Sequence, residues 1–166
     1  QLVSLAEEKH LTVKLPRSTV LYELDIDAVS ADVSVDLTEE DTLTLQELDV
    51  SSVSGNVSVS AANAGEISLS TTSGAVSGSV RTGKLEADTV SGTVALTLEV
   101  LPTELEVETV SGGVALTLTE KPSVPVDVVF RTVSGQLDSD VDSTVGADCV
   151  WEIETTSGDA VIRIAA

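Results

Sequence analysis

Carboxylates are the groups in this sequence whose type and spacing come closest to metal chemistry. Asp138, Asp140 and Asp142 occupy alternate positions, and alternate residues of a strand project to the same side. Three carboxylates on one side form a candidate Ca²⁺ site, because Ca²⁺ takes several oxygen ligands. We favour a solvated acidic face instead, because acidic residues are spread along the whole chain. No other metal site is expected.

Paired carboxylates also serve glycoside hydrolysis, and some β-helix proteins carry such pairs along one face. Sugar sites usually add aromatic side chains on which a ring can stack. The sequence offers only Tyr22, Phe130 and Trp151 for that purpose, and the last two fall at positions expected to face a core. A carbohydrate- or Ca²⁺-binding surface module of the polysaccharide-active β-helix type is therefore the alternative function.

The sequence gives little support for a nucleophilic catalytic site or a phosphate-binding site. Residues 78–84 match the first seven places of a phosphate-binding loop, but Leu85 stands where serine or threonine is required. A strand is expected to follow, whereas phosphate binding needs the N-terminus of a helix. The one histidine of the sequence, His10, lies far from any distinctive serine. We expect no catalytic residue, no cofactor and no enzymatic activity.

The charge of the chain is strongly negative. Acidic residues outnumber basic ones 28 to 8, which gives a formal net charge of -20, so nucleic acids and anionic membrane surfaces should repel the protein. Acids scattered among β-branched residues favour a halophilic, archaeal source, because concentrated salt screens their repulsion. The single cysteine, Cys149, cannot form a disulfide within the chain. The sequence has no run of about 20 apolar residues, so it does not predict a membrane-spanning helix.

A Thr/Val-Ser-Gly phrase recurs along the whole chain and reveals its organisation. Successive motif serines are separated by 24, 19, 18, 20, 23 and 23 residues, a period of one supersecondary unit that must lean on its neighbours. The sixth and fourth residues before each serine are apolar, and the residues between them are mostly polar, which indicates a half-buried strand. The motif serines are Ser30, Ser54, Ser73, Ser91, Ser111, Ser134 and Ser157.

Glycine follows almost every motif serine, and a second short apolar strand begins two residues later. Glycine between two strands supplies a bend where a side chain would clash or where φ is positive. Ala31 replaces glycine in the first copy. The predicted structural turn residues are Gly55, Gly74, Gly92, Gly112, Gly135 and Gly158.

A strand, a bend and a second strand, repeated seven times, could form antiparallel hairpins or a parallel coil. Likeness between equivalent positions of all copies favours the coil, in which each residue sits above its equivalent. We predict an all-β parallel β-solenoid of about seven rungs, with 1–23 as an end segment or first rung and 24–166 as repeats of one domain. If rungs stack in sequence order, Arg131 lies between Glu108 and Glu154 and bridges them.

The phrases at 89–94, 109–114 and 132–135, such as Thr-Val-Ser-Gly-Thr-Val, resemble the repeat of a bacterial and archaeal adhesin-type β-strand-repeat family. The resemblance covers roughly residues 20–166. It implies a right-handed parallel β-helix in an exported or membrane-anchored surface protein. The repeat is structural, so the resemblance implies no catalytic residues.

These observations predict a non-enzymatic, extracellular structural or adhesin-like protein that associates end to end into surface filaments. The strand through Ala160, Ile162 and Ile164 is expected to form the last rung, with nothing to cover it, and an uncovered rung offers free backbone groups to a second copy. Residues 1–17 hold three bases against two acids, so the two ends differ in charge. Such head-to-tail contacts propagate as filaments.

One modification site is also predicted. Asn56-Val57-Ser58 is an N-glycosylation sequon beside a bend, which an exported protein in a glycosylating host could use.

Folding should depend on salt. Stacked strands place like charges directly above one another, which destabilises the folded state until salt screens them. We expect the melting temperature to rise steadily from low to molar NaCl, and a flat melting temperature over that range would contradict the halophile interpretation. The stacked acids include Asp25, Asp49, Glu86, Glu106 and Glu152.

Overall fold

The computed structural model describes residues 21–37 and 45–165 of the chain. Twelve strands in these residues join into one continuous sheet, in which all pairings between the described strands are parallel. The predicted all-β parallel solenoid is therefore confirmed. His10 and the basic residues of 1–17 lie outside the described residues, as does most of the predicted end segment 1–23.

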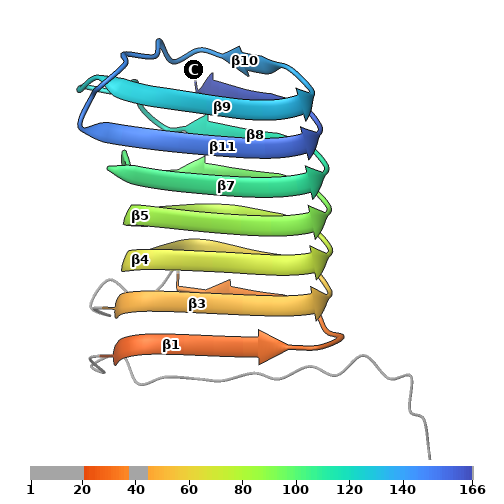
Figure 1. The fold of residues 1–166 in the computed structure, drawn as a ribbon. Helices are drawn as coiled ribbons and strands as arrows, with labels where there is room; N and C mark the ends of the chain where they lie inside the picture. Colours follow the sequence, from red (N-terminus) through yellow and green to blue (C-terminus); the bar gives the residue numbers. More distant parts are fainter. Residues whose placement is uncertain (1–20, 38–44, 166) are drawn as a thin grey trace, which may run out of the picture.

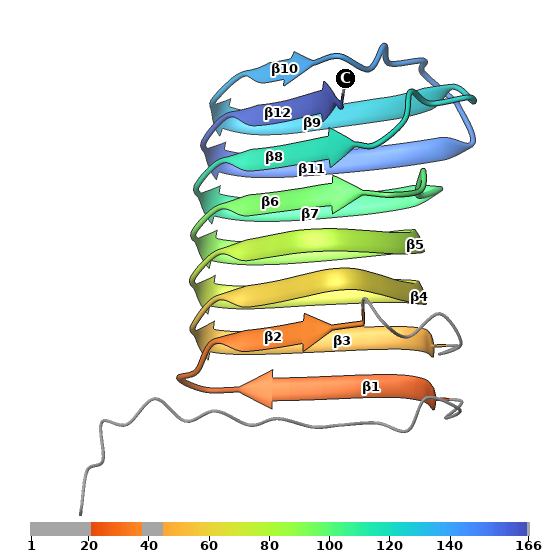
Figure 2. The same ribbon diagram turned by 180° about the vertical axis from the view of Figure 1, so that it is seen from behind.

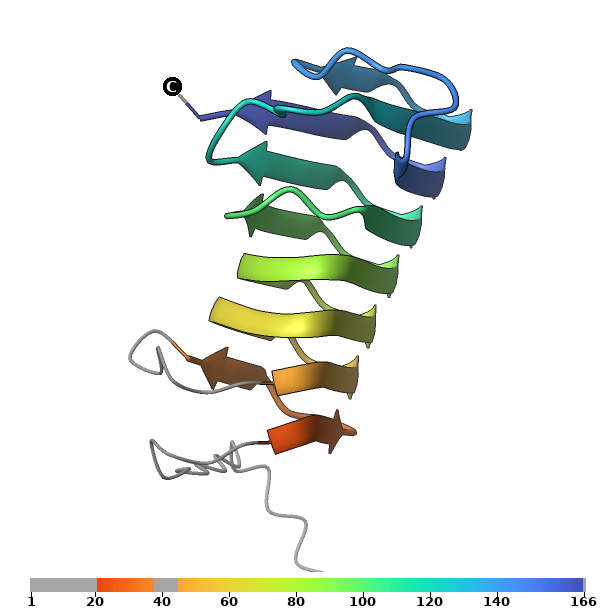
Figure 3. The same cartoon turned by 90° about the vertical axis from the view of Figure 1, so that its left-hand side faces the viewer.

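The chain coils through two faces, which Figure 3 shows edge-on as two layers. The first face holds the strands that lead to the motif bends (Figure 1). Their spatial order is β1 (Leu21–Ala28), β3 (Leu45–Ser54), β4 (Val57–Ser73), β5 (Val76–Ser91), β7 (Glu104–Ser111), β11 (Cys149–Ser157) and β9 (Val126–Ser134). The second face follows the motif glycines (Figure 2), in the order β2 (Val33–Asp36), the first parts of β4 and β5, β6 (Val94–Leu98), β8 (Val114–Leu118), β12 (Ala160–Ile164) and β10 (Leu137–Ser139).

One strand from each face makes a rung, and the described strands form seven rungs. β4 and β5 are long because each begins on the second face and continues around a corner onto the first. The register of β4 against β5 shifts at that corner, between Val59 and Ala62.

Residues of equivalent sequence position are register partners, as predicted. Ser73 is the partner of Ser54 in β3 and of Ser91 in β5, and Ser111 is the partner of Ser91 and of Ser157. The alignment of repeats in the sequence is therefore the physical register of the sheet. Each inward column of apolar side chains becomes one continuous strip of core.

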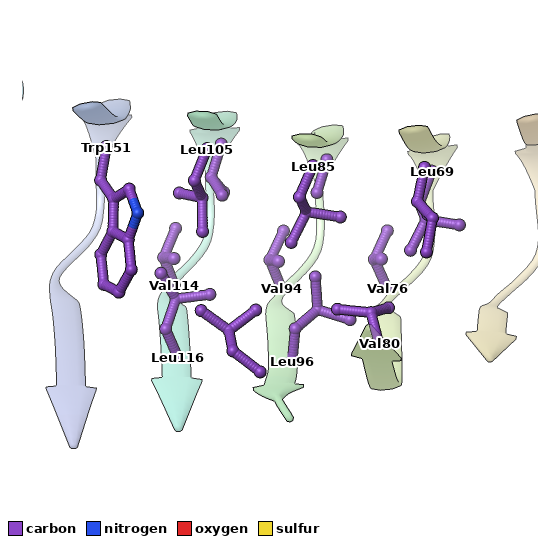
Figure 4. Close-up of a cluster of buried hydrophobic side chains, with 14 of the residues drawn as sticks. Leu69, Val76, Val80, Leu85, Val94, Leu96, Leu105, Val114, Leu116 and Trp151 are labelled. Carbon is purple, nitrogen blue, oxygen red and sulfur yellow. The ribbon is translucent and has the colours of Figure 1, made fainter. Parts of the chain in front are cut away.

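The core runs the length of the solenoid between the two faces (Figure 4). Alternation along each strand turns one set of side chains inward, and those of the central rungs are fully or almost fully buried. Trp151 is the largest buried side chain, and its indole N–H donates a hydrogen bond of 3.0 Å to the carbonyl of Pro102. Side chains of the end rungs, such as Ile26 and Phe130, are only partly buried.

The Thr and Gly of the repeated phrase interlock between rungs. A Cβ on Gly74 would lie 2.2 Å from the carbonyl oxygen of Gly55, and a Cβ on Gly92 would lie 1.7 Å from that of Gly74. Only glycine leaves room for the bend stacked against it. The hydroxyls of Thr71 and Thr89 donate to the same carbonyls of Gly55 and Gly74, at 2.9 and 3.3 Å. The phrase therefore encodes a stacked bend.

The order of the last two rungs differs from the prediction. β11 lies between β7 and β9, and β12 lies between β8 and β10, as Figures 1 and 2 show. The rung that contains Ala160, Ile162 and Ile164 is thus covered on both sides, and the expectation of an uncovered final rung is wrong. The chain passes over one rung between β8 and β9, then returns to fill the gap.

The rung β9–β10 takes the end position because it carries its own cover. Residues 140–148, between β10 and β11, cross over the outer edge of β9. The Thr144 N–H donates to the carbonyl of Val126 at 2.8 Å, and the Val128 N–H donates to the Ser143 hydroxyl at 2.9 Å. Val141 is buried against the core. Backbone groups that an end rung would leave free are thereby partly satisfied.

The changed order also moves Arg131. Arg131 is the register partner of Glu154, whereas Glu108 lies on the far side of β11, so the predicted bridge between Glu108 and Glu154 does not form. The guanidinium of Arg131 instead makes an ion pair with Glu152, which lies two residues before Glu154 on the same side of β11.

Replacing Gly92 by alanine should disrupt the stacked bends. The added Cβ meets backbone rather than a movable side chain, so we expect a loss of about 1–3 kcal/mol in the free energy of unfolding, measured by denaturant titration. Gly83→Ala is the matched control, in the strand β5 that ends just before Gly92, because the nearest atom to its added Cβ would be 3.8 Å away. Equal losses for both variants would contradict the stacked-bend interpretation.

Candidate functional site

An exposed ladder of valines runs along the first face beside the bends. The residue just before each motif serine points outward, and in five rungs it is a valine that is 49% to 84% exposed. Half of the ten large hydrophobic side chains that the structure exposes belong to this one column, so the exposure is systematic. We call it the valine ladder: Val29, Val53, Val90, Val110 and Val133, with Thr72 and Thr156 in the two remaining rungs.

Two columns of acids run parallel to the valine ladder on the same face. Register partners Glu86, Glu106 and Glu152 form one column, and Asp88, Glu108 and Glu154 form the other. Both columns point outward, because they lie at the polar positions of the alternating strands. We call these six residues the acidic columns. Negative charge is therefore concentrated on the middle rungs of the first face.

A shallow groove lies between the acidic columns and the valine ladder. It has a volume of about 510 Å³ and extends over β3, β4, β5, β7 and β11. Asp88, Glu108 and Glu154 line one side, and Val90 and Val110 line the other. Between these two walls the side chains of the motif threonines point inward, so the backbone forms the floor of the groove. The groove thus joins an anionic wall to an apolar wall along the long axis.

Burial and neighbouring acids together perturb Asp88. Burial first, and then the neighbouring Glu86, Glu108 and Glu106, raise the pKa of the Asp88 carboxyl from 3.8 to about 6. Burial and nearby acids also raise the pKa of Asp49. A cationic group from another molecule would relieve this repulsion, because opposite charge favours the ionised carboxylate. The groove is electrostatically suited to a cation-bearing ligand.

The predicted Ca²⁺ ligands lie elsewhere, on and after β10. Arg163 of β12 makes ion pairs with both Asp138 and Asp140, the second at 3.5 Å, and the Ile164 N–H donates to Asp140 at 3.2 Å. The guanidinium lowers the pKa of Asp138. Asp142 is exposed on the following connection. Within the described residues no group of three or more His, Cys, Asp or Glu side chains is arranged to hold a metal ion.

The other residues singled out in the sequence have structural surroundings. Asn56 sits exposed at a bend, where its side-chain carbonyl accepts a 2.9 Å hydrogen bond from the Ala75 N–H. Residues 78–84 lie within strand β5, and Lys84 pairs with Glu66 at 2.7 Å. Cys149 is a buried free thiol. Glycosylation of Asn56 stays a prediction.

Sequence reasoning missed the valine ladder although the signal was present. Val90 and Val110 belong to the repeated phrase, and they lie an odd number of residues from the inward-facing positions Leu85 and Leu105. That parity alone places them outside. An apolar residue that recurs at an outward position is a signal for an interaction surface.

The chain was compared with known families and proteins. The family model described as Toastrack DUF4097 matches residues 2–165. No curated protein and no solved structure gave a match. None of the described segments is a helix with the length and apolar character to cross a membrane.

Replacing Asp88 by asparagine should stabilise the protein at neutral pH. Because the folded-state pKa lies above the ordinary value, ionisation of Asp88 opposes folding above pH 6, and this penalty fades as the pH falls toward 4. We expect Asp88→Asn to raise the free energy of unfolding by roughly 1 kcal/mol at pH 7, allowing for solvent screening, and to change it little near pH 4.

Asp138→Asn is the matched control for that measurement. The pKa of Asp138 is lowered by Arg163, so its ionised form favours folding and its replacement should destabilise the protein at pH 7. Denaturant titrations at both pH values provide the comparison. A shift of the same sign for both variants at pH 7 would contradict the assigned charge environment of the groove.

Proposed function

The chain belongs to the Toastrack family, and we propose that it is a non-enzymatic, adhesin-like structural module of the cell surface. The family match supports a family of β-strand repeats, but it shows neither the adhesin assignment nor the Thr-Val-Ser-Gly phrase of the resemblance. The adhesin role, the extracellular location and self-association belong to the proposal. We propose that the axial groove is the face with which this module contacts a partner.

The observation that carries this proposal is the pairing of the valine ladder with the acidic columns along one groove. Exposed apolar side chains normally occur singly on a soluble protein, whereas apolar side chains gathered on one face mark an interaction surface. Within the groove, Val90 and Val110 lie on adjacent rungs. Parallel stacking repeats Val90 and Val110 in register, and the strands that carry them, β5 and β7, each pair with a strand on both sides of the first face. A partner would thus meet a rigid, preformed surface, which lowers the entropy lost on binding.

The chemistry of the groove selects one class of partner. We infer a polypeptide segment that carries both basic and apolar side chains. Basic side chains would face Asp88, Glu108 and Glu154, and apolar side chains would cover Val90 and Val110. A net charge of -20 repels nucleic acid and anionic lipid but attracts basic peptides over long range. Such a segment would neutralise the most strongly perturbed carboxylate of the face, Asp88.

A shallow open groove also fits binding better than catalysis. Its lining contains hydroxyls and carboxylates, but nucleophilic activation of a hydroxyl requires an adjacent base held by a third group. The motif threonines of β4 and β5, Thr71 and Thr89, are buried and donate their hydroxyls to the bend carbonyls of neighbouring rungs. The proposed role therefore rests on shape and charge.

A peptide probe tests this role. We expect a fluorescently labelled peptide of about ten alternating lysine and valine residues to bind, because a strand of that length spans the five rungs of the groove. Val90→Ser combined with Val110→Ser should weaken binding roughly tenfold through loss of apolar contact. Fluorescence anisotropy at near-physiological salt gives the affinity.

Two controls make the peptide experiment specific. Val124→Ser combined with Val145→Ser removes two exposed valines away from the groove and should leave the affinity unchanged. A peptide of alternating glutamate and valine should not bind, because like charges face one another. Equal weakening by both pairs of substitutions, or no binding of the basic peptide, would refute the groove as the partner-binding face.

A further inference from the structure

The last two rungs are joined to the rest of the solenoid by a single seam. Among the described strands, β9 pairs with β11 alone and β10 pairs with β12 alone. β11 and β12 in turn pair with β7 and β8. We call residues 126–164 the C-terminal cap and residues 21–118 the body. All strand pairing between cap and body passes through the segment that comes last in the sequence.

This arrangement makes the cap one cooperative unit. If β11 and β12 left the body, β9 and β10 would keep no partner in the body, so both rungs must dock or leave together. The cap stays coherent by itself, because β9 and β11 share eight register pairs and residues 143–144 bind the edge of β9. Units of this kind open as wholes below the global unfolding free energy.

The connection between body and cap has the character of a hinge. Residues 120–125 (Glu-Lys-Pro-Ser-Val-Pro) are exposed, apart from the half-buried Pro122, and make no hydrogen bond with the rest of the described chain. Pro122 and Pro125 favour an extended backbone. Six residues reach about 20 Å when extended, and the connection must rise two rungs, about 10 Å, while it turns from the second face to the first, as residues 99–103 do over one rung between β6 and β7. Its hinge character therefore rests on its exposure and on its lack of hydrogen bonds to the described residues.

We propose that two copies of this chain exchange their C-terminal caps, so that the cap of each docks on β7 and β8 of the other. The partner is a second copy, because the seam is already complementary to itself: Trp151 buries against the connection at Pro102, and Ile153 packs in the column of Val107. Exchange reuses these contacts and needs no new surface. The inference deepens the proposed self-association and rests on it.

Exchange also fits the end of the solenoid better than direct stacking does. A second rod stacked end to end would need the outer edge of β9, but Ser143 and Thr144 already occupy that edge at Val126 and Val128. The edge of β7 that pairs with β11 is exposed only when the cap detaches from the body. The whole length of that edge is then free to pair with the cap of another copy.

A cysteine pair across the seam distinguishes exchange from other association. Glu104 and Val150 are register partners on β7 and β11, and both side chains are exposed. In a Cys149→Ala background, Glu104→Cys with Val150→Cys should form a disulfide within one chain in the monomer and between two chains after exchange. The reduced variant is incubated in molar NaCl at several concentrations, diluted, oxidised and run on a non-reducing gel.

We expect a covalent dimer whose ratio to monomer rises about tenfold for a tenfold rise in monomer concentration. Glu108→Cys with Glu154→Cys is a second seam pair on the same strands, for use if the first variant does not fold. Lys84→Cys with Glu104→Cys joins β5 to β7 within the body, so its disulfide should stay within one chain.

Each outcome bears on exchange. A covalent dimer in the seam pair alone, together with oxidised monomers that stay monomeric when concentrated, supports it. Covalent dimers in both pairs, or association of the oxidised monomer equal to that of the reduced form, overturn it in favour of surface contact. Dimers seen by light scattering without interchain disulfides overturn exchange but leave self-association standing. Monomers at every concentration overturn both.

Discussion

The vertical register between rungs governs the rest of this molecule. Parallel backbone hydrogen bonds set each residue about 4.8 Å from its equivalent in the next rung, so any property of one position is repeated along the axis. Apolar residues become a continuous core, and Gly74 can stack on Gly55 only because it has no Cβ to meet the Gly55 carbonyl oxygen. The same rule stacks acid on acid at Glu86 and Glu106. Stabilising and destabilising features share one geometric origin.

Much of the fold could be predicted because register partners are equivalent residues, so columns of the aligned repeats are columns of the sheet. The order of the rungs along the axis could not be predicted from the sequence. Trp151 and Val128 belong to the same inward column, so the rung of either residue fits beside β7. Contacts of residues 140–148 with β9 decide between the two orders, and no repeat pattern reports them. The groove could have been predicted from the outward parity of Val90, whereas the raised pKa of Asp88 depends on burial that only the structure gives.

The groove shows how a repetitive scaffold acquires a distinct surface. Middle rungs carry glutamate or aspartate in both outward columns, whereas β9 carries Val129 and Arg131 at the equivalent places. The acidic columns and the valine ladder therefore lie side by side over only part of the length of the solenoid. Small departures from the repeat decide where a partner would be recognised, although they change neither the backbone nor the core.

The inserted rung also matters for how the protein is made. A chain that emerges from a ribosome or a translocation pore presents its N-terminal rungs first, and each can add to the one before it. The strands β9 and β10 emerge with no finished neighbour, because their partners β11 and β12 follow later in the sequence. Growth by simple addition therefore stops at β8 until Ile164 is available. The final quarter of the solenoid is completed in one step rather than rung by rung.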